Sequence, residues 1–220
     1  RNAGRIVTGT ISDDFDKLAE CDWIIEAVVE RLDIKKDLYA RLDATIGPDC
    51  IVSSNTSTIP ISLLVEDMPT VFRKRFAITH YFNPVRYMRL LELVRGTDTD
   101  RAVNDRVLGK GVVRCADTPG FLGNRVGVFA LQAGIDEAMR NKLTVEQADA
   151  LMGRPMGIPK TGVFGLYDLI GIDLMVDVVA SLRSILPEGD AFHAIGGENE
   201  MISAMIADGY TGDKGLGGFY

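Results

Sequence analysis

The chain has 220 residues, of which 46% are hydrophobic and 25% are charged, a composition typical of a globular protein. Its formal net charge of −7 at pH 7 gives no electrostatic reason to expect a nucleic acid or an acidic lipid as partner. No apolar run reaches the ~18 residues that a membrane-spanning helix needs, and the first residues are unlike a signal peptide. We therefore expect neither a membrane nor a nucleic acid among the partners.

Three cysteines, Cys21, Cys50 and Cys115, lie far apart in the sequence. Their number is odd, and no pair has the spacing of metal ligands. We therefore expect reduced thiols in a cytoplasmic protein, with no metal site.

The first half of the chain alternates short apolar runs with helical patterns. Apolar residues recur every four positions from Ile34 to Ile46, which is the spacing of one helix face. Strands that are apolar on both faces and separated by helices favour a mostly parallel sheet covered on both sides. We predict strands at 6–11, 23–29, 50–54, 76–82, 90–95 and 111–115, with helices at 33–46, 60–67 and near 100–108.

From residue 117 onward the pattern is helical throughout. A long apolar periodicity covers residues 121–141, and the sequence TVEQ from Thr144 to Gln147 is a capping box for the next helix. Further helices are predicted at 163–170, 172–186 and 199–208. We place a domain boundary near residue 116, between an α/β part (1–116) and an all-helical part (117–220).

Two candidate catalytic residues lie in neighbouring predicted strands. His80 ends one apolar run just before Asn83 and Pro84, and Glu92 lies inside the returning run LLELV. If the turn brings them together, the carboxylate holds the imidazole in one tautomer and stabilises its protonated form, so that His80 can accept a proton. The alternative is a structural pair, or a Glu92 that faces water from an edge strand. Spacing alone leaves both interpretations open.

Other polar segments have a functional and a structural interpretation each. The segment SSNTSTIP (53–60) leaves a predicted strand, where it either binds a ligand or caps a helix. Glu30 and Lys35 either project near the same sheet edge or form a solvated helix start. Asn124 lies early in the long helix and needs a hydrogen-bond partner, either protein or ligand. Lys214, in a Gly-rich segment, either faces solvent or reaches an anionic ligand.

Seven segments occur in the order seen in the L-3-hydroxyacyl-CoA dehydrogenase family, namely EAVVE, SSNTS, HYFNP, LLELVRG, DTPGFLGNR, GRPMG and GGFY. The resemblance covers about residues 18–220, and GRPMGIPKTGVFGLYDLIGID is most similar to the dehydrogenase part of multifunctional fatty-acid oxidation proteins. It implies a Rossmann-type NAD-binding domain, then a helical domain that carries a homodimer interface. It also implies oxidation of the 3-hydroxyl group of an acyl-CoA by NAD in fatty-acid β-oxidation, with an enoyl-CoA hydratase domain or partner.

The resemblance assigns roles residue by residue. It implies that His80 is the general base and that Glu92 orients it. It also implies that Ser57 contacts the substrate near the nicotinamide and that Asn124 holds the substrate oxygen. The cofactor-binding positions that it implies are Glu30, Lys35, Ser57, Asn83 and Lys214.

One hallmark of a Rossmann domain, a G-x-G-x-x-G turn between a strand and a helix, does not occur in the 220 residues. The glycines of GDKGLGG have a different spacing and follow no predicted strand, and the segment 97–108 is shorter than the helix of the family. We expect that segments of a longer protein are omitted, because a parallel sheet without its first strand would expose apolar edges. The predicted sheet is thus incomplete, and NAD binding by these residues alone is expected to be weak.

Two other functions compete with this interpretation. A non-catalytic acyl-CoA-binding or dimerisation module that has lost the cofactor-binding half would need no proton acceptor at His80. A 3-hydroxyacid dehydrogenase of similar build would carry a catalytic lysine on the long helix, where this chain has Asn124 and Arg125. The residues therefore favour the 3-hydroxyacyl-CoA dehydrogenase.

Overall fold

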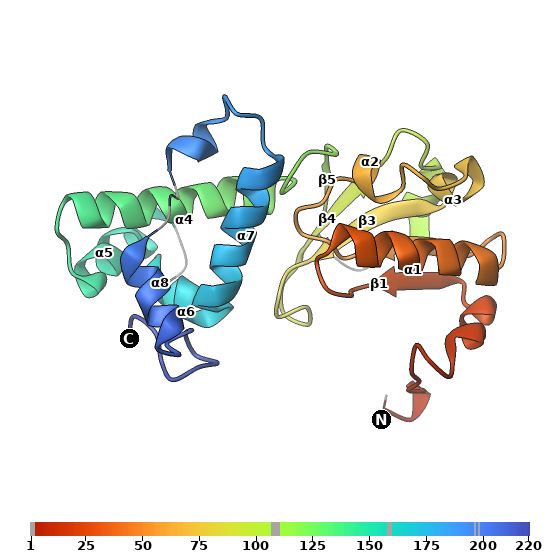
Figure 1. Ribbon diagram of the computed structural model, residues 1–220, viewed down its shortest axis with the longest axis horizontal. Coiled ribbons are helices and arrows are strands. Elements are labelled where there is room, and N and C mark those ends of the chain that lie inside the picture. The colour runs from red at the N-terminus through yellow and green to blue at the C-terminus, as the bar shows by residue number, and fades with distance from the viewer. Residues whose placement is uncertain (1–2, 107–110, 158–159, 196, 198) are drawn as a thin grey trace. The chain divides into compact units, whose positions relative to one another are not determined.

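The structure is a computed structural model, and it describes residues 3–106, 111–157, 160–195, 197 and 199–220 (Figure 1). The chain divides into two compact units, Arg1–Phe121 and Leu122–Tyr220. The division falls a few residues after the boundary expected from the sequence.

The first unit is built on a five-stranded sheet whose strands lie in chain order. The strands are β1 (Trp23–Glu26), β2 (Ile51–Ser54), β3 (Phe76–Tyr81), β4 (Leu90–Arg95) and β5 (Gly111–Cys115). Strands β3 and β4 run antiparallel, whereas the other neighbouring pairs are parallel. The prediction of a mostly parallel sheet, with a helical part after it, is confirmed.

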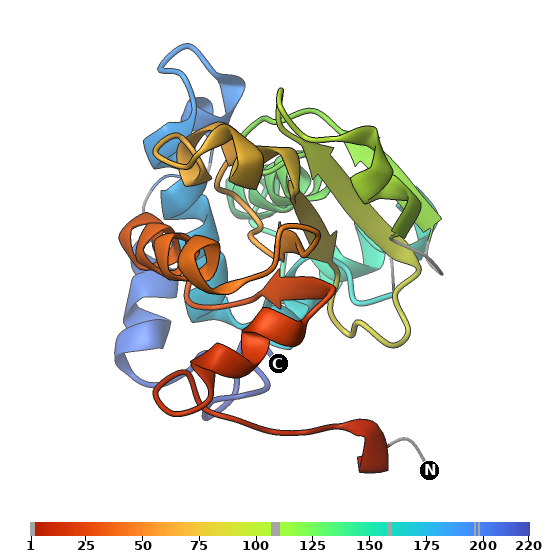
Figure 2. The ribbon, with the colours of Figure 1, turned by 90° about the vertical axis from the view of Figure 1, so that its right-hand side faces the viewer.

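Helices pack on both faces of this sheet; in the described residues, three α-helices lie on one face and a single 3₁₀ helix on the other (Figure 2). The α-helices on one face are α1 (Leu32–Thr45), α2 (Ile61–Leu64) and α3 (Thr70–Lys74), of which α3 was not predicted. Tyr39 and Phe72 from these helices pack against Phe76 of β3 in one core cluster. On the opposite face, Val103 of the 3₁₀ helix η3 (Arg101–Arg106) packs against Leu93. The helix expected near 100–108 is therefore this 3₁₀ helix, and residues 107 and 108 lie outside the described residues.

The segment before β1 differs from the prediction. Apart from the 3₁₀ helices η1 (Ala3–Arg5) and η2 (Phe15–Glu20), it forms coil and turns, so the strand expected at 6–11 is wrong. The side chains of Ile6 and Val7 are 71% and 87% exposed. A strand is stable when its backbone pairs with a neighbour, and none of the described strands pairs with this segment.

In the described residues of the second unit, all regular elements are helices, apart from one isolated bridge between Gly212 and Gly217. Its α-helices are α4 (Gly123–Arg140), α5 (Val145–Leu151), α6 (Phe164–Ile170), α7 (Ile172–Ile185) and α8 (Glu200–Ala207), with the 3₁₀ helices η4 (Arg154–Met156) and η5 (Ala191–Ala194). The predicted capping box is present, since the side chains of Thr144 and Gln147 each accept the backbone N–H of the other. None of the described helices is long and apolar enough to cross a membrane.

Two buried aspartates organise the second unit. The carboxylate of Asp149 accepts the backbone N–H groups of residues 163–165 at 2.7–2.9 Å, which caps the first turn of α6. It also accepts the hydroxyl of Tyr220 at 3.1 Å. Asp168 accepts the backbone N–H groups of Phe219 and Tyr220 at 2.9 and 3.1 Å, and so fixes that segment against α6.

Candidate active site

Polar side chains replace the apolar core at the carboxyl ends of three neighbouring strands. Glu26 ends β1, Ser54 ends β2, and His80 is the residue before the end of β3. Glu26 is opposite Ser54, and Ser54 is opposite Ile78, so the side chains of Glu26, Ser54 and His80 project from the face that α1 covers. Open parallel sheets bind their ligands beyond this edge.

His80 and Glu92 lie directly opposite each other in the antiparallel pair of β3 and β4. Nδ1 of His80 is 2.7 Å from Oε2 of Glu92, and the two residues are only 6% and 0% exposed. Because an ionised carboxylate only accepts hydrogen bonds, a neutral His80 paired with it donates from Nδ1 and keeps the lone pair of Nε2. The structure therefore brings the predicted pair together, and the alternative in which Glu92 faces water is wrong.

The surroundings of this pair are largely apolar. The rings of Phe82 and Phe121 lie 4.6 and 6.1 Å from the His80 ring, measured between centroids. The thiol of Cys115 donates to the other carboxylate oxygen of Glu92 at 3.6 Å. A buried charge needs partners of this kind, which explains how Glu92 is accommodated among the leucines of β4.

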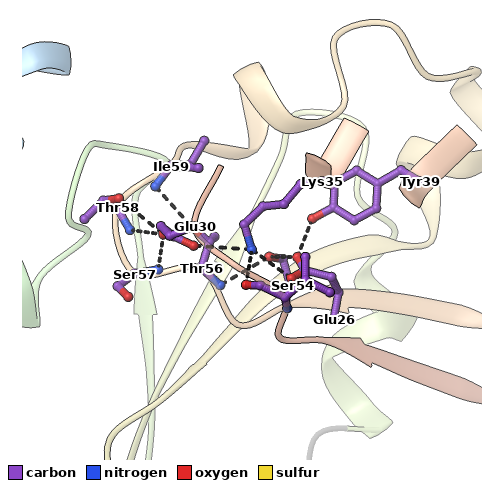
Figure 3. Close-up of polar contacts among 10 residues, drawn as sticks. Glu26, Glu30, Lys35, Tyr39, Ser54, Thr56, Ser57, Thr58 and Ile59 are labelled. Carbon is purple, nitrogen blue, oxygen red and sulfur yellow. Dashed lines mark hydrogen bonds and ion pairs between the residues drawn. The ribbon is translucent and has the colours of Figure 1, made fainter. Parts of the chain in front are cut away.

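The loop after β2 is organised around the carboxylate of Glu30 (Figure 3). Oε1 of Glu30 accepts the hydroxyl of Thr56 at 2.5 Å and the backbone N–H groups of Ser57 and Thr58 at 2.9 and 3.2 Å. The hydroxyl of Thr58 also donates to this oxygen, at 3.2 Å. Ser57, the predicted substrate contact, therefore lies in a loop that Glu30 holds through several hydrogen bonds.

Asn55 joins the same loop to the strand that carries the histidine. Its Oδ1 accepts the backbone N–H of Tyr81, the residue after His80, at 3.0 Å. The segments SSNTS and HYFNP, which the sequence places far apart, are thus linked at the sheet edge. Spacing along the chain gave no indication of this hydrogen bond.

Lys35 is buried rather than solvated. Its Nζ lies 2.7 Å from Oε1 of Glu26 and 3.3 Å from Oε2 of Glu30, and the residue is 1% exposed. The interpretation of Lys35 as part of a solvated helix start is therefore wrong. An ammonium group is stable in such a place only when carboxylates surround it.

Sequence reasoning missed Glu26, which lies at the centre of this cluster (Figure 3). One carboxylate oxygen accepts the backbone N–H of Val28 and the ammonium of Lys35, both at 2.7 Å. The other accepts the hydroxyls of Tyr39 and Ser54 at 2.7 and 2.6 Å. The signal was available, because a carboxylate inside the apolar run WIIEAVV resembles the one that marked LLELV.

We expect the first unit to lose stability at acid pH because of Glu26. Burial raises the pKa of Glu26, but hydrogen bonds from Lys35, Ser54 and Tyr39 outweigh it and hold the pKa below its ordinary value of 4.5. Since the unfolded chain binds the proton more readily, the stabilisation is complete above the unfolded-state pKa and is lost as the pH falls through the lower folded-state pKa. Urea unfolding followed by the fluorescence of Trp23, the chain's single tryptophan, measures this loss.

The matched variant is Glu26→Gln, which cannot titrate. Between about pH 6 and pH 3, the urea concentration at the midpoint of unfolding should fall further in the parent than in this variant. An equal loss in both proteins would show that Glu26 is not the group responsible.

The remaining predicted residues lie apart from these contacts or in the other unit. Asn83 is exposed in the loop after β3. Asn124 lies half-buried in the first turn of α4, and Lys214 is exposed with its Nζ 3.4 Å from the carbonyl oxygen of Ile170. Their roles in binding substrate or cofactor stay predictions.

A mostly parallel sheet with polar side chains at its carboxyl edge, followed by a helical unit, is an architecture that occurs among nicotinamide-dependent dehydrogenases. Residues 2–118 match the family model described as the 3-hydroxyacyl-CoA dehydrogenase NAD binding domain, and residues 120–220 match that of the C-terminal domain. The chain therefore belongs to the 3-hydroxyacyl-CoA dehydrogenase family.

Individual relatives agree with this membership. A Rickettsia prowazekii protein, provisionally described as a fatty acid oxidation complex trifunctional enzyme, is 41% identical over 98% of this chain and 31% of its own length. A Bacillus subtilis protein described as a probable 3-hydroxyacyl-CoA dehydrogenase is 36% identical over 100% of this chain and 28% of its own length. The crystal structure of M. tuberculosis FadB2 is similar with a TM-score of 0.83 and 32% identity, over 94% of this chain and 73% of that one. The chain thus spans about a third of the length of the first of these curated relatives.

Proposed function

We propose that this chain is the dehydrogenase part of a protein that oxidises the 3-hydroxyl group of an acyl-CoA to a ketone, with transfer of hydride to NAD. The observation that carries the proposal is the buried His80–Glu92 pair at the carboxyl edge of the sheet, in a chain of this family. A module that only binds acyl-CoA has no use for a proton acceptor held in one tautomer.

The proposed step is a proton transfer to His80. Because Nδ1 donates to Glu92, Nε2 is the acceptor for the proton of the 3-hydroxyl group while the hydride leaves C3. NAD, when bound, supplies the acceptor for that hydride. The negative charge of Glu92 stabilises the imidazolium that forms. A positioned base of this kind contributes ~10²–10⁴-fold to the rate.

The residues of the first unit fit part of an NAD site. Glu30 keeps 35% of its side chain exposed, and its carboxylate accepts the backbone N–H of Ser57, so polar groups lie together at this edge. The G-x-G-x-x-G segment that would bind the pyrophosphate does not occur in the 220 residues. We assign Glu30, Ser57 and Asn83 to the nicotinamide side of the cofactor, and Lys35, whose buried ammonium lies between Glu26 and Glu30, to holding Glu30 there.

The second unit contributes to the same proposal through the resemblance. The resemblance assigns the substrate oxygen to Asn124 and a place near the cofactor to Lys214. A homodimer formed through the helical unit and an enoyl-CoA hydratase partner belong to the proposal as well. The description of the R. prowazekii relative as part of a fatty acid oxidation complex supports a role in β-oxidation.

The direct test is an assay of the full-length protein with acetoacetyl-CoA and NADH, followed by the loss of NADH absorbance. We expect turnover in the range of about 1–10³ s⁻¹ that is typical of enzymes. Crotonyl-CoA, which has no 3-keto group, serves as the control and should consume no NADH. Tight binding of acetoacetyl-CoA without NADH consumption would contradict the proposal and favour the acyl-CoA-binding module.

A further inference from the structure

The carboxylate of Glu26 is a fixed point beneath α1. The residue is 3% exposed, and each of its two oxygens accepts two hydrogen bonds. A buried carboxylate with four donors has a single orientation, because any rotation would leave donors unsatisfied.

Lys35 connects this fixed point to a second carboxylate. Its Nζ lies between Glu26 and Glu30, at 2.7 and 3.3 Å. The carbonyl oxygen of Val28 lies 3.4 Å from the same nitrogen, so the ammonium has three acceptors for its three donors. The position of Glu30 therefore depends on where Lys35 is held.

Glu30 in turn holds the loop that carries Ser57. Residues 55–60 form neither helix nor strand, so this loop has no ladder of backbone hydrogen bonds to fix it. Oε1 of Glu30 instead accepts the backbone N–H groups of Ser57 and Thr58 (Figure 3). Asn55 and the backbone N–H of Thr56 have other partners, whereas the backbone of Ser57 and Thr58 is held by this carboxylate.

We propose that Glu26 is a positioning residue for this loop, acting through Lys35 and Glu30 without touching a ligand. The succession Glu26–Lys35–Glu30–Ser57 transmits the fixed orientation of a buried carboxylate to the sheet edge. That this edge receives the nicotinamide rests on the proposed function, whereas the positioning of the loop does not.

The test is Glu26→Gln in the full-length protein, with two measurements. Glutamine places an amide N–H₂ group where donors point and removes the charge that attracts Lys35. Amide hydrogen exchange at Ser57 and Thr58 should accelerate by about tenfold or more, because their acceptor becomes mobile. The dissociation constant for NADH, measured by its fluorescence on binding, should rise by a similar factor.

Tyr39→Phe is the matched control. It removes one hydrogen bond to the same carboxylate but leaves the contact between Glu26 and Lys35 intact. Exchange at Ser57 and Thr58 should match the parent, and NADH binding should stay within about twofold. If Tyr39→Phe accelerates exchange at these amides as much as Glu26→Gln does, the effect is general loosening and the proposal is overturned.

Lys35→Met tests the same set of contacts at the residue that joins Glu26 to Glu30. Its effect on exchange should equal that of Glu26→Gln, and the double variant should add little, since both act through one contact. Unchanged amide exchange at Ser57 and Thr58 in Glu26→Gln would refute the positioning role. If Glu26→Gln does not fold, unchanged exchange in Lys35→Met would refute it. A parent protein that binds no NADH would refute the proposed function instead, and the exchange data would still decide the inference.

Discussion

Replacement of His80 by glutamine is expected to lower kcat/KM for the reduction of acetoacetyl-CoA by about 10²–10⁴-fold while leaving the melting temperature close to that of the parent. In this direction the imidazolium donates its proton to the forming alkoxide, and glutamine has no proton to give. Folding should persist because the glutamine amide offers an N–H to the buried carboxylate of Glu92, which therefore keeps a partner.

The matched control is His193→Gln, because the chain has only two histidines. His193 lies in η5 of the second unit, half-buried, with its Nε2 3.3 Å from the carbonyl oxygen of Leu186. We expect its activity to match that of the parent. Retention of more than about a tenth of the parent activity by His80→Gln would rule out general-base catalysis by His80.

The activity of Glu92→Gln should fall between that of His80→Gln and that of His193→Gln. Glutamine keeps a hydrogen-bond acceptor for His80 but loses the charge that stabilises the imidazolium.

Replacement of Asp149 by alanine is expected to destabilise the second unit by about 3–5 kcal/mol. The change would leave the three backbone N–H groups of residues 163–165 and the hydroxyl of Tyr220 without their acceptor. Two of those N–H groups belong to the buried residues Val163 and Phe164, which are 2% and 4% exposed. Urea unfolding followed by far-UV circular dichroism measures the loss.

Asp177→Ala provides the comparison for this variant. Asp177 is an exposed aspartate on α7, and its replacement should change the free energy of unfolding by no more than about 0.5 kcal/mol. Equal stability of the Asp149 and Asp177 variants would show that the cap on α6 carries little of the stability of the second unit.

The sequence predicts the regular elements of this chain well and its loop contacts poorly. Apolar runs located the strands from β1 to β5, and apolar periodicity located the long helix α4. Burial of apolar side chains explains β2, β3, β4 and one face of α4, whereas β1 and β5 bury no apolar residue. The apolar pattern was misleading at 6–11, where the run IVTGTI has the composition of a strand. Composition does not reveal whether a neighbouring strand is available to pair.

The same contrast holds for the site. A charge in an apolar run marked Glu92 correctly and would have marked Glu26 too, since burial of a carboxylate always demands partners. The contact of Glu30 with the N–H of Ser57 depends instead on the path of a loop without regular structure. The hydrogen bond between Asn55 and Tyr81 likewise joins segments that no periodicity relates.

The reversal of chain direction between β3 and β4 has a consequence for how such a site can arise. The histidine and its carboxylate are twelve residues apart and belong to one hairpin, whereas parallel neighbours would need a long crossover between them. His80 and Glu92 therefore lie in a single short stretch of polypeptide. A slip of one residue in the pairing of β3 with β4 would turn Glu92 to the other face of the sheet, away from His80, so the register of these two strands has to be kept for the pair to form.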